Sequence, residues 1–569
     1  MLALRAILWC GLALGAVSHA LAQTVSGDFL AGQAAIRAND YKSAAQYFDR
    51  AFGAAPQNLG HQDSAMRAYL ALGHINHAAK MAHALEAQDY TNPTTDMLLT
   101  LHAFANGRYD DALKRLKNGT IISEPIDPLL QAWAHFGAGR VSQALQQFDE
   151  LAQSRRVANL ALTQKALAHA MIGDFESAET LYAGDDTRPP LPRTVRGLQA
   201  RAQGLAQMGQ VDQALELLDS TFGTGRNPVA DDLRFRISIG APVEFDIARD
   251  AKGGAAEVLY FLSHTLQNER TDDVVLVYAQ FARFLAPQNV DATLLVAEVL
   301  EDLGNHDLAT LVYDDVPRGH PSFVSAEIGR ASALEASDQA DTAIEVLRQL
   351  SETNPAHRRV HIILGDHLRR QKRYQEAIFA YGTAIDLIPQ ESEIDWYVYF
   401  VRGIAHERSG DFESSDLDFR KSIALSPNRH QVLNYLGYSM VERQINMEEA
   451  LDMIKQAVDL QPDAGYIVDS LGWVLYRMGQ YAEAVNHMEK AAELMATDPV
   501  VNDHLGDVYW AVGRKSEARF QWRRAASFIT PNTSLNDIDP ARVHRKLEVG
   551  LDQVLAEEGA PPLKVADDN

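Results

Sequence analysis

Residues 470–494 read SLGWVLYRMGQYAEAVNHMEKAAEL, and residues 504–528 read HLGDVYWAVGRKSEARFQWRRAASF. When the two stretches are aligned on their Leu-Gly pairs, a second glycine and two alanines also coincide, each 34 residues after its counterpart. A period of this length, with small residues in register, predicts a series of units that each consist of two antiparallel helices. One unit alone leaves an apolar face exposed, so we expect the units to stack into an all-α superhelical solenoid.

Small residues hold the helices of each predicted pair close together. Gly472 and Gly506 are expected where the two helices cross, because a side chain there would push them apart. Gly479 follows a first helix, where the backbone must take a left-handed conformation that glycine enters without steric cost. Ala484 begins the buried face of a second helix. The structural repeat positions identified in this way are Ala44, Gly437, Ala450, Gly472, Ala484, Gly506 and Ala518.

This arrangement of Leu-Gly, Gly and Ala resembles the tetratricopeptide repeat (TPR) family. The signature Gly-x-x-x-x-Ala, or a variant of it, occurs fourteen times along the chain. Asn39 replaces the glycine in the first copy, and asparagine is the next most tolerant residue in that conformation. The resemblance implies a TPR superhelix in which the first helix of each pair lines an inner groove for a protein or peptide.

The N-terminal sequence MLALRAILWCGLALGAVSHALA (residues 1–22) predicts a secretory signal peptide. Arg5 precedes a short apolar run, and Ala20 and Ala22 place small residues at the −3 and −1 positions of a cleavage site near Ala22. We therefore expect the mature protein in the periplasm of a Gram-negative bacterium, with an uncleaved anchor as the alternative. Cys10, the only cysteine of the sequence, lies in the apolar run, so the mature chain would contain no disulfide.

The composition is strongly acidic. The chain has 52 Lys and Arg against 76 Asp and Glu, which gives a formal net charge of −24. Such a charge argues against nucleic acid or an anionic membrane as the main partner, because both are themselves anionic. The acidic surface either favours a basic partner or only keeps the protein solvated.

The repeat pattern is interrupted once, at residues 221–254, where glycines and prolines accumulate. Apolar residues from Phe235 to Ile239 favour a short strand or an extended turn there. The segment is interpreted as a hinge or, alternatively, as an inserted loop packed on the solenoid. The predicted domains are a signal peptide at 1–22, a degenerate TPR array at 23–220, the irregular insert or hinge at 221–254, a C-terminal TPR array at 255–530, a capping helix at 531–558 and a disordered tail at 559–569.

No catalytic motif is recognisable, and we expect no enzymatic activity, no cofactor and no metal. His357 and His361 are four residues apart near a helix start, a spacing that could place two ligands on one helix face. An incidental pair is the simpler interpretation. A rival hypothesis is an enzyme, or its regulatory subunit, with the activity hidden in residues 221–254.

Aromatic residues occupy the positions of the later first helices that face the groove in TPR folds. Rings supply contact area at low entropic cost, and Asn or Asp can hydrogen-bond a peptide backbone. The alternative is that these rings fill the interior of the superhelix. The Lys and Asn pattern with which some TPRs bind an acidic C-terminus is largely missing, so a basic or neutral apolar segment fits better. The predicted peptide-binding residues are Tyr397, Phe400, Asn434, Tyr438, Tyr466, Asp469, Trp473, Tyr476, Asp507 and Trp510.

Residues 433–525 also resemble a subfamily of exported bacterial TPR proteins that serve as adaptors of periplasmic C-terminal-processing proteases. That resemblance implies a scaffold in the cell envelope whose partner is a protease or a cell-wall enzyme. The lipoprotein cysteine of one member type is missing here, which leaves peripheral association with the outer membrane as a hypothesis. The alternative function is a structural component of an envelope export or polysaccharide assembly complex.

Overall fold

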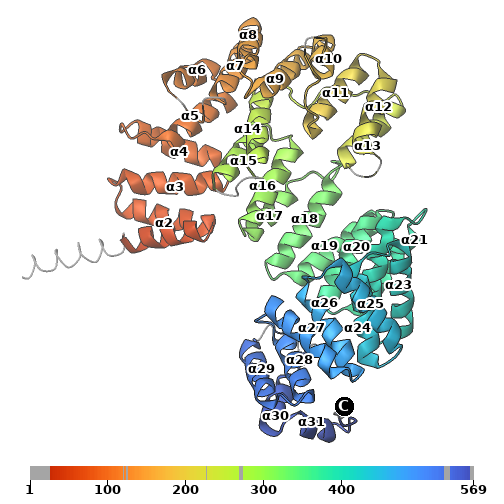
Figure 1. The fold of residues 1–569 in the computed structure, drawn as a ribbon. Coiled ribbons are helices and arrows are strands. Elements are labelled where there is room, and N and C mark those ends of the chain that lie inside the picture. Colours follow the sequence, from red (N-terminus) through yellow and green to blue (C-terminus); the bar gives the residue numbers. More distant parts are fainter. Residues whose placement is uncertain are drawn as a thin grey trace, which may run out of the picture. The chain divides into compact units, whose positions relative to one another are not determined.

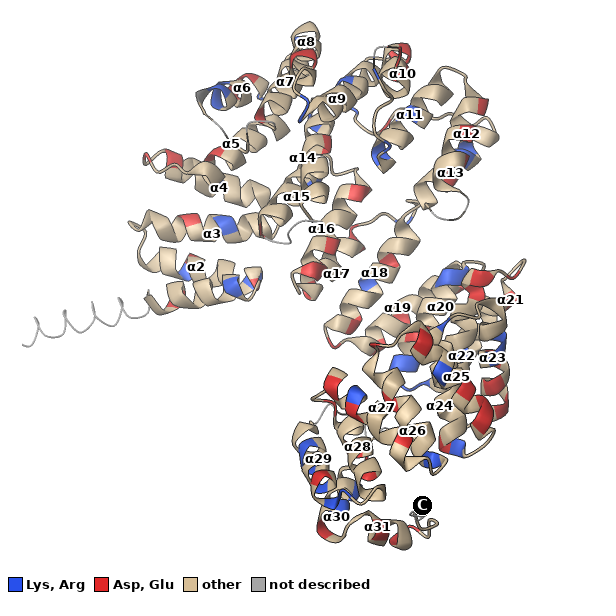
Figure 2. Ribbon diagram, viewed as in Figure 1, with Lys and Arg blue, Asp and Glu red and all other residues tan. Residues whose placement is uncertain are grey.

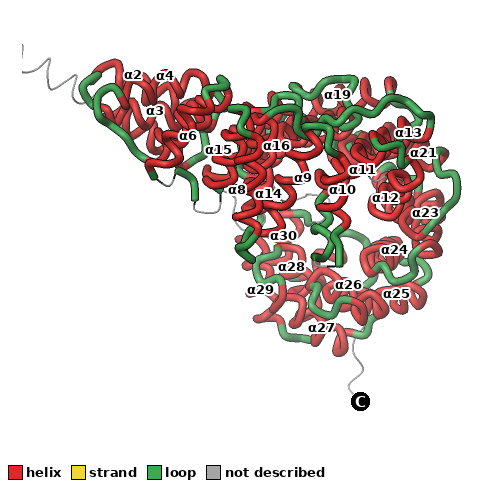
Figure 3. The backbone as a smooth tube through the Cα atoms, turned by 90° about the horizontal axis from the view of Figure 1, so that it is seen from above, coloured by secondary structure: helices red, strands yellow, loops and turns green. Residues whose placement is uncertain are grey.

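The computed structural model describes residues 26–563 except 120, 124–125, 187, 224, 226, 268–272, 531–532 and 534–537. The predicted signal peptide and residues 564–569 of the predicted tail lie outside this part. Within it the regular structure consists of helices without a strand, which confirms the predicted all-α class (Figure 3). The chain divides into two compact units, Met1–Leu350 and Ser351–Asn569, and each is described separately.

The first unit consists of consecutive antiparallel helix pairs (Figure 1). A helix at residues 26–37 pairs with α2. The helices that follow are α2 (Tyr41–Ala54), α3 (Leu59–Ala71), α4 (Ile75–Glu86), α5 (Pro93–Ala105), α6 (Tyr109–Asn118), α7 (Asp127–Gly137), α8 (Val141–Ala152), α9 (Ala158–Met171), α10 (Phe175–Ala183), α11 (Val195–Gln207), α12 (Val211–Phe222), α13 (Pro228–Ser238), α14 (Ala251–Gln267), α15 (Asp273–Leu285), α16 (Val290–Asp302), α17 (His306–Asp314), α18 (Phe323–Ala336) and α19 (Ala340–Thr353).

Helices α14 and α15 pack against the first helices of the preceding pairs. Helix α14 contacts α7 and α9, and α15 contacts α3 and α5, so both lie inside the arc formed by α2–α13 (Figure 1). Gly254 of α14 lies so close to Trp133 of α7 that a Cβ would be 2.4 Å from the indole Cδ2. Trp133 is fully buried, and its Nε1 donates to Gln164 Oε1 at 2.9 Å. The inner wall of the N-terminal array is therefore covered by the chain itself.

The second unit continues the same pattern of helix pairs and ends in two shorter helices. The first helix of each pair carries an even number from α20 to α28. The elements are α20 (Arg358–Arg370), α21 (Tyr374–Asp386), the 3₁₀ turn η1 (Glu393–Asp395), α22 (Trp396–Arg408), α23 (Phe412–Leu425), α24 (His430–Arg443), α25 (Met447–Leu460), α26 (Gly465–Arg477), α27 (Tyr481–Leu494), α28 (Pro499–Ala511), α29 (Lys515–Phe528), α30 (Pro540–Val549) and α31 (Leu551–Glu557).

The small repeat residues lie at close contacts in this structure. A Cβ on Gly472 would lie 2.6 Å from Met488 Cγ, and one on Gly506 would lie 2.3 Å from Trp522 Nε1. Ala484 is completely buried, as are Ala44, Ala450 and Ala518 at the equivalent positions. The turn glycine Gly479 has φ +82°, and Asn39 takes the same left-handed conformation with φ 57°.

Two segments differ from what the sequence led us to expect. Helix α13 occupies most of the stretch for which a strand or extended turn was expected, and Phe235 is helical. Residues 239–250 are irregular, and the boundary between the two compact units lies between Leu350 and Ser351. Residues 540–557 form two helices, where a single capping helix was expected, because Gly550 adopts φ +86° between them.

Candidate protein-binding face of the second unit

The first helices of the pairs form the inner wall of the second unit. Helix α26 contacts both α24 and α28, and α20 contacts α22, whereas successive second helices have no comparable contacts in the described part. In a curved stack the helices of the inner wall are closer together than those of the outer wall. All ten predicted peptide-binding residues lie on the first helices α22, α24, α26 and α28.

Two of the predicted residues are open to solvent on this wall. Tyr397 on α22 is 38% exposed and Tyr466 on α26 is 44% exposed. The hydroxyl of Tyr397 donates to Asp366 Oδ2 at 3.2 Å. Burial, with the nearby Asp366 charge, raises the pKa of Tyr397 to about 12, so the phenol remains a donor at neutral pH.

Phe400 and Tyr438 are half-buried, and Asn434 is buried on α24, the first helix between those that carry the two exposed tyrosines. Phe400 packs against Trp396 and Tyr435 with ring centroids 5.9 and 5.8 Å apart. Asn434 is 8% exposed, and its Oδ1 has no hydrogen-bond partner in the described part of the chain. A buried amide oxygen without a partner costs free energy, which an N–H donor of a bound chain would recover.

The predicted residues on α26 are instead engaged inside the protein. The Trp473 ring stacks between Tyr476 and His504, with centroids 4.9 and 3.9 Å away, and its Nε1 donates to Glu442 Oε1 at 2.7 Å. Asp469 lies 3.0 Å from His504 Nδ1. Asp469, Trp473 and Tyr476 are each at most 8% exposed. Asp469 and Trp473 connect α26 to α28, and all three side chains have little surface left for a ligand.

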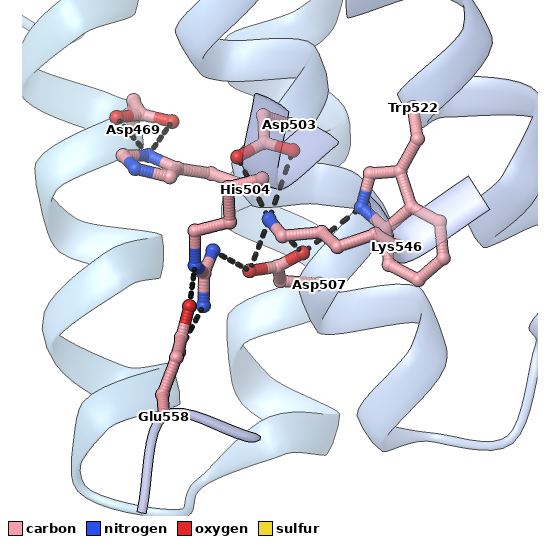
Figure 4. Close-up of polar contacts among 8 residues, drawn as sticks. Asp469, Asp503, His504, Asp507, Trp522, Lys546 and Glu558 are labelled. Carbon is pink, nitrogen blue, oxygen red and sulfur yellow. Dashed lines mark hydrogen bonds and ion pairs between the residues drawn. The ribbon is translucent and has the colours of Figure 1, made fainter. Parts of the chain in front are cut away.

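At the end of the array, helix α30 inserts a lysine into the inner wall (Figure 4). Lys546 is completely buried, and its Nζ donates to both carboxylates of Asp503 and Asp507, at 2.8 and 2.6 Å for the shorter contacts. Trp522 Nε1 also donates to Asp507, at 2.9 Å. Lys and Arg positions are frequent on the ribbon of α29 and α30, in a chain that is acidic as a whole (Figure 2). The cluster of Lys546, Asp503, Asp507 and Trp522 therefore holds α30 in place by charge as well as by packing.

Burial controls the ionisation of this cluster. Burial raises the pKa of Asp507, and the charge of Lys546 opposes the shift without cancelling it. Burial disfavours the charged form of His504, yet Asp469 together with Asp503 and Asp507 outweighs this effect, and the pKa of His504 lies above its ordinary value. Arg542 lies 3.6 Å from Asp507 and donates to Glu558 at 2.8 Å. Every charge in the cluster has an opposite partner, as buried ions require.

Helices α30 and α31 also cover Trp510. A Cβ on Gly550 would lie 2.4 Å from Trp510 Cη2, and Trp510 is 6% exposed. Asp507 and Trp510 thus bind the chain's own terminal helices and do not line the open face. The roles of His504, Trp522 and Lys546 were not identified from the sequence. The sequence signal for them was weak: Lys546 lies on an amphipathic helix downstream of Asp503 and Asp507, which are four residues apart.

Neither a membrane span nor a metal centre stands out in the described part of the chain. None of the helices there combines the length and the apolar character needed to cross a bilayer. No cluster of three or more His, Cys, Asp or Glu with metal-ligand geometry occurs among the same residues. His361 of the histidine pair noted in the sequence is hydrogen-bonded to the carbonyl of Pro355 at 2.9 Å.

Comparison with known proteins supports the repeat assignment. Residues 129–187, 328–392 and 469–497 match family models of the tetratricopeptide repeat. A TPR repeat-containing protein of Pseudomonas aeruginosa is 27% identical over 162 residues, which are 28% of this chain and 27% of that protein. Tetratricopeptide repeat protein 1 of Schizosaccharomyces pombe is 22% identical over 363 residues, 58% of this chain and 33% of that protein.

The chain thus spans between about a quarter and a third of the length of these relatives. Among solved structures, the APC/C hetero-tetramer Cut9-Hcn1 is 16% identical with a TM-score of 0.37, and the match covers 92% of this chain and 95% of that chain. The family models place tetratricopeptide repeats in both compact units.

Proposed function

We propose that this chain, which carries tetratricopeptide repeats, is a non-catalytic scaffold that binds an extended segment of a partner protein on the inner wall of α22, α24 and α26. Asn434 is the observation that carries the proposal. In the described part of the chain its buried Oδ1 lacks a hydrogen-bond partner, and the two neighbouring first helices carry the exposed tyrosines Tyr397 and Tyr466. Aromatic faces beside a backbone-binding amide suit a peptide in extended conformation.

The proposed binding face is limited at one end by the protein itself. Because α30 and α31 cover Asp507 and Trp510, a partner segment would contact α22, α24 and α26 but not the inner wall of α28. The contact residues we propose are therefore Tyr397, Phe400, Asn434, Tyr438 and Tyr466. A segment with basic or neutral apolar side chains fits a face on a chain of net charge −24.

We place this scaffold in the periplasm, after cleavage near Ala22, on the basis of the N-terminal sequence. A periplasmic C-terminal-processing protease or a cell-wall enzyme is the proposed partner, supported by the resemblance of residues 433–525. Peripheral outer-membrane association is part of the same proposal. N-terminal sequencing of the mature protein should find Gln23 first, and an intact Met1 would contradict the export step. A structural role in an envelope export or polysaccharide complex is the second candidate and would appear as stable co-fractionation with the outer membrane.

The test is crosslinking in cells followed by mass spectrometry, with the wild type compared against Tyr397→Ala combined with Tyr466→Ala. We expect the yield of the specifically crosslinked partner to fall at least about tenfold in the double variant, which is the loss typical when aromatic contact residues are truncated. Phe379→Ala is the matched control, because Phe379 on the second helix α21 is 79% exposed. An identical set of partners for the double variant and the wild type would remove the proposed binding face.

A further inference from the structure

A polar cleft in the first unit has a composition that suggests a second binding site. It encloses about 480 Å³ between helices α11 and α13, the irregular segment after α13, the start of α16 and the loop before α18. A volume of this size is typical of sites for small ligands and short peptide segments. The cleft lies in the first unit, so it is separate from the face described above.

The acidic groups of the cleft are all engaged by neighbouring donors. Asp246 accepts from Gln203 Nε2 at 2.7 Å and Asp291 accepts from Arg196 at 2.7 Å. Asp232 lies 3.8 Å from Arg236. These pairs also fasten the irregular segment, because Asp246 N donates back to Gln203 at 3.1 Å. Each of the three carboxylates of the wall therefore already has a hydrogen-bond or ion-pair partner.

Donors, by contrast, remain available in the same cleft. Arg249 is exposed and forms no ion pair among the described residues. His320 Nδ1 accepts from Ser322 N at 3.1 Å, which leaves its Nε2 to carry the proton of the neutral ring. Burial lowers the pKa of His320 despite the opposing charges of Asp291, Asp246 and Asp232, so this neutral donor form prevails at pH 7.

One acceptor in the cleft also lacks a partner. Gln199 is 2% exposed, lines the cleft, and its Oε1 forms no hydrogen bond in the described part of the chain. A ligand with an N–H group near an anion would satisfy this oxygen and the free donors together. A peptide segment that carries a carboxylate has both groups.

We infer that this cleft binds a carboxylate of a peptide, with Arg249 and His320 as donors to the anion and Gln199 as acceptor for a backbone N–H. The carboxylate can belong to a C-terminus or to an Asp or Glu side chain. The three aspartates of the wall, with Glu257 paired to Arg196 behind it, outnumber its three arginines, so a monoanion fits better than a phosphate dianion.

Fluorescence polarisation on the full chain tests the inference with three sets of labelled hexapeptides. One set has a free C-terminus, the second is amidated without acidic residues, and the third is amidated with an internal Glu. We expect the first or third set to bind and the second not to bind. Binding only by the first set identifies a C-terminus, and binding by the third identifies a side chain.

Arg249→Ala should weaken that binding by about tenfold or more, the loss expected for a charge-assisted hydrogen bond. The exposed Arg155→Ala in the same unit is the matched control. Gln199→Met should also weaken binding without loss of stability, because it removes a buried oxygen that has no hydrogen-bond partner among the described residues. Tyr397→Ala with Tyr466→Ala should bind the peptides as the wild type does, which separates this site from the proposed scaffold face. Failure of every set to saturate, or equal binding by Arg249→Ala, would overturn the inference.

Discussion

Helices α14 and α30 each cover the inner wall of a helical array, but different interactions hold them. Against α14, the wall helix α7 presents Trp133, and Gly254 lets the two backbones approach within contact of the indole. Against α30, the wall helix α28 presents Asp503 and Asp507, and Lys546 is buried between them. The first contact depends on shape and the second on charge.

The difference predicts how each contact responds to change. Apolar close packing loses free energy when volume is added or removed, because the surrounding backbone adapts only partly. A buried ion pair tolerates little change in charge, because removal of one partner leaves the other charge desolvated. Variants at the two contacts should therefore lose stability for different physical reasons and by different amounts.

Lys546→Ala should have the largest effect. Removal of the ammonium takes the cation away from the buried Asp503 and leaves Asp507 with Arg542 at 3.6 Å, which costs about 3–5 kcal/mol. Hydrogen exchange in α28 and α30, together with urea unfolding of the full chain, would measure the loss. Lys515→Ala is the control, since its side chain is 54% exposed and lies 3.5 Å from Asp552. A Lys546 variant as stable as this control would show that charge does not hold α30.

Gly254→Ala should have the next largest effect, about 1–3 kcal/mol of destabilisation from overpacking against the fully buried Trp133. Thermal unfolding followed by tryptophan fluorescence measures it. Gly204→Ala is the matched helical control, because a Cβ there would meet Phe175 Cδ1 at an ordinary 3.5 Å. That control should gain stability, up to about 1 kcal/mol. Equal stabilities of the two variants would contradict a close contact between α14 and α7.

The sequence allowed prediction of the repeat but not of what covers the repeat. Gly472, Gly506 and Ala484 act within one helix pair, so their spacing alone is sufficient to identify their contacts. Trp133 and Gly254 are 121 positions apart, and no periodic signal connects them. Asp507 was expected on an open groove because its position in the unit faces inward, and α30 covers that position.

The same distinction applies to the candidate site. The inward position of Tyr397 and Tyr466 could be predicted from the repeat, and both are exposed in the structure. The burial of Trp473 could not be predicted, because it depends on stacking with His504 of the next unit. A residue's direction follows from local helical spacing, whereas its accessibility depends on neighbours that are distant in sequence.

A pH titration would sharpen the comparison further. Asp469, with smaller contributions from Asp503 and Asp507, holds the pKa of His504 above its unfolded value despite burial. This group therefore contributes stability that is fully present below the unfolded pKa and is lost as the pH rises through the folded pKa. We expect the free energy of unfolding of the second unit to fall as the pH rises from the unfolded to the folded pKa of His504. The Asp469→Asn variant should lack that decline. A decline of the same size in the variant would exclude the His504–Asp469 pair as its source.

The smallest expected effect lies in a turn outside both contacts and provides a baseline for them. Lys372, between α20 and α21, has φ 58°, where the equivalent turns of other pairs have glycines such as Gly410 and Gly479. A side chain in this conformation costs roughly 1 kcal/mol, part of which the flexibility of an unfolded glycine offsets. Lys372→Gly should therefore raise the melting temperature slightly relative to Lys372→Ala, which removes the same charge but keeps a Cβ. Equal melting temperatures of the two variants would mean that the turn adopts this conformation without strain. A similarly small change in melting temperature for a variant at α14 or α30 could then not be attributed to backbone strain.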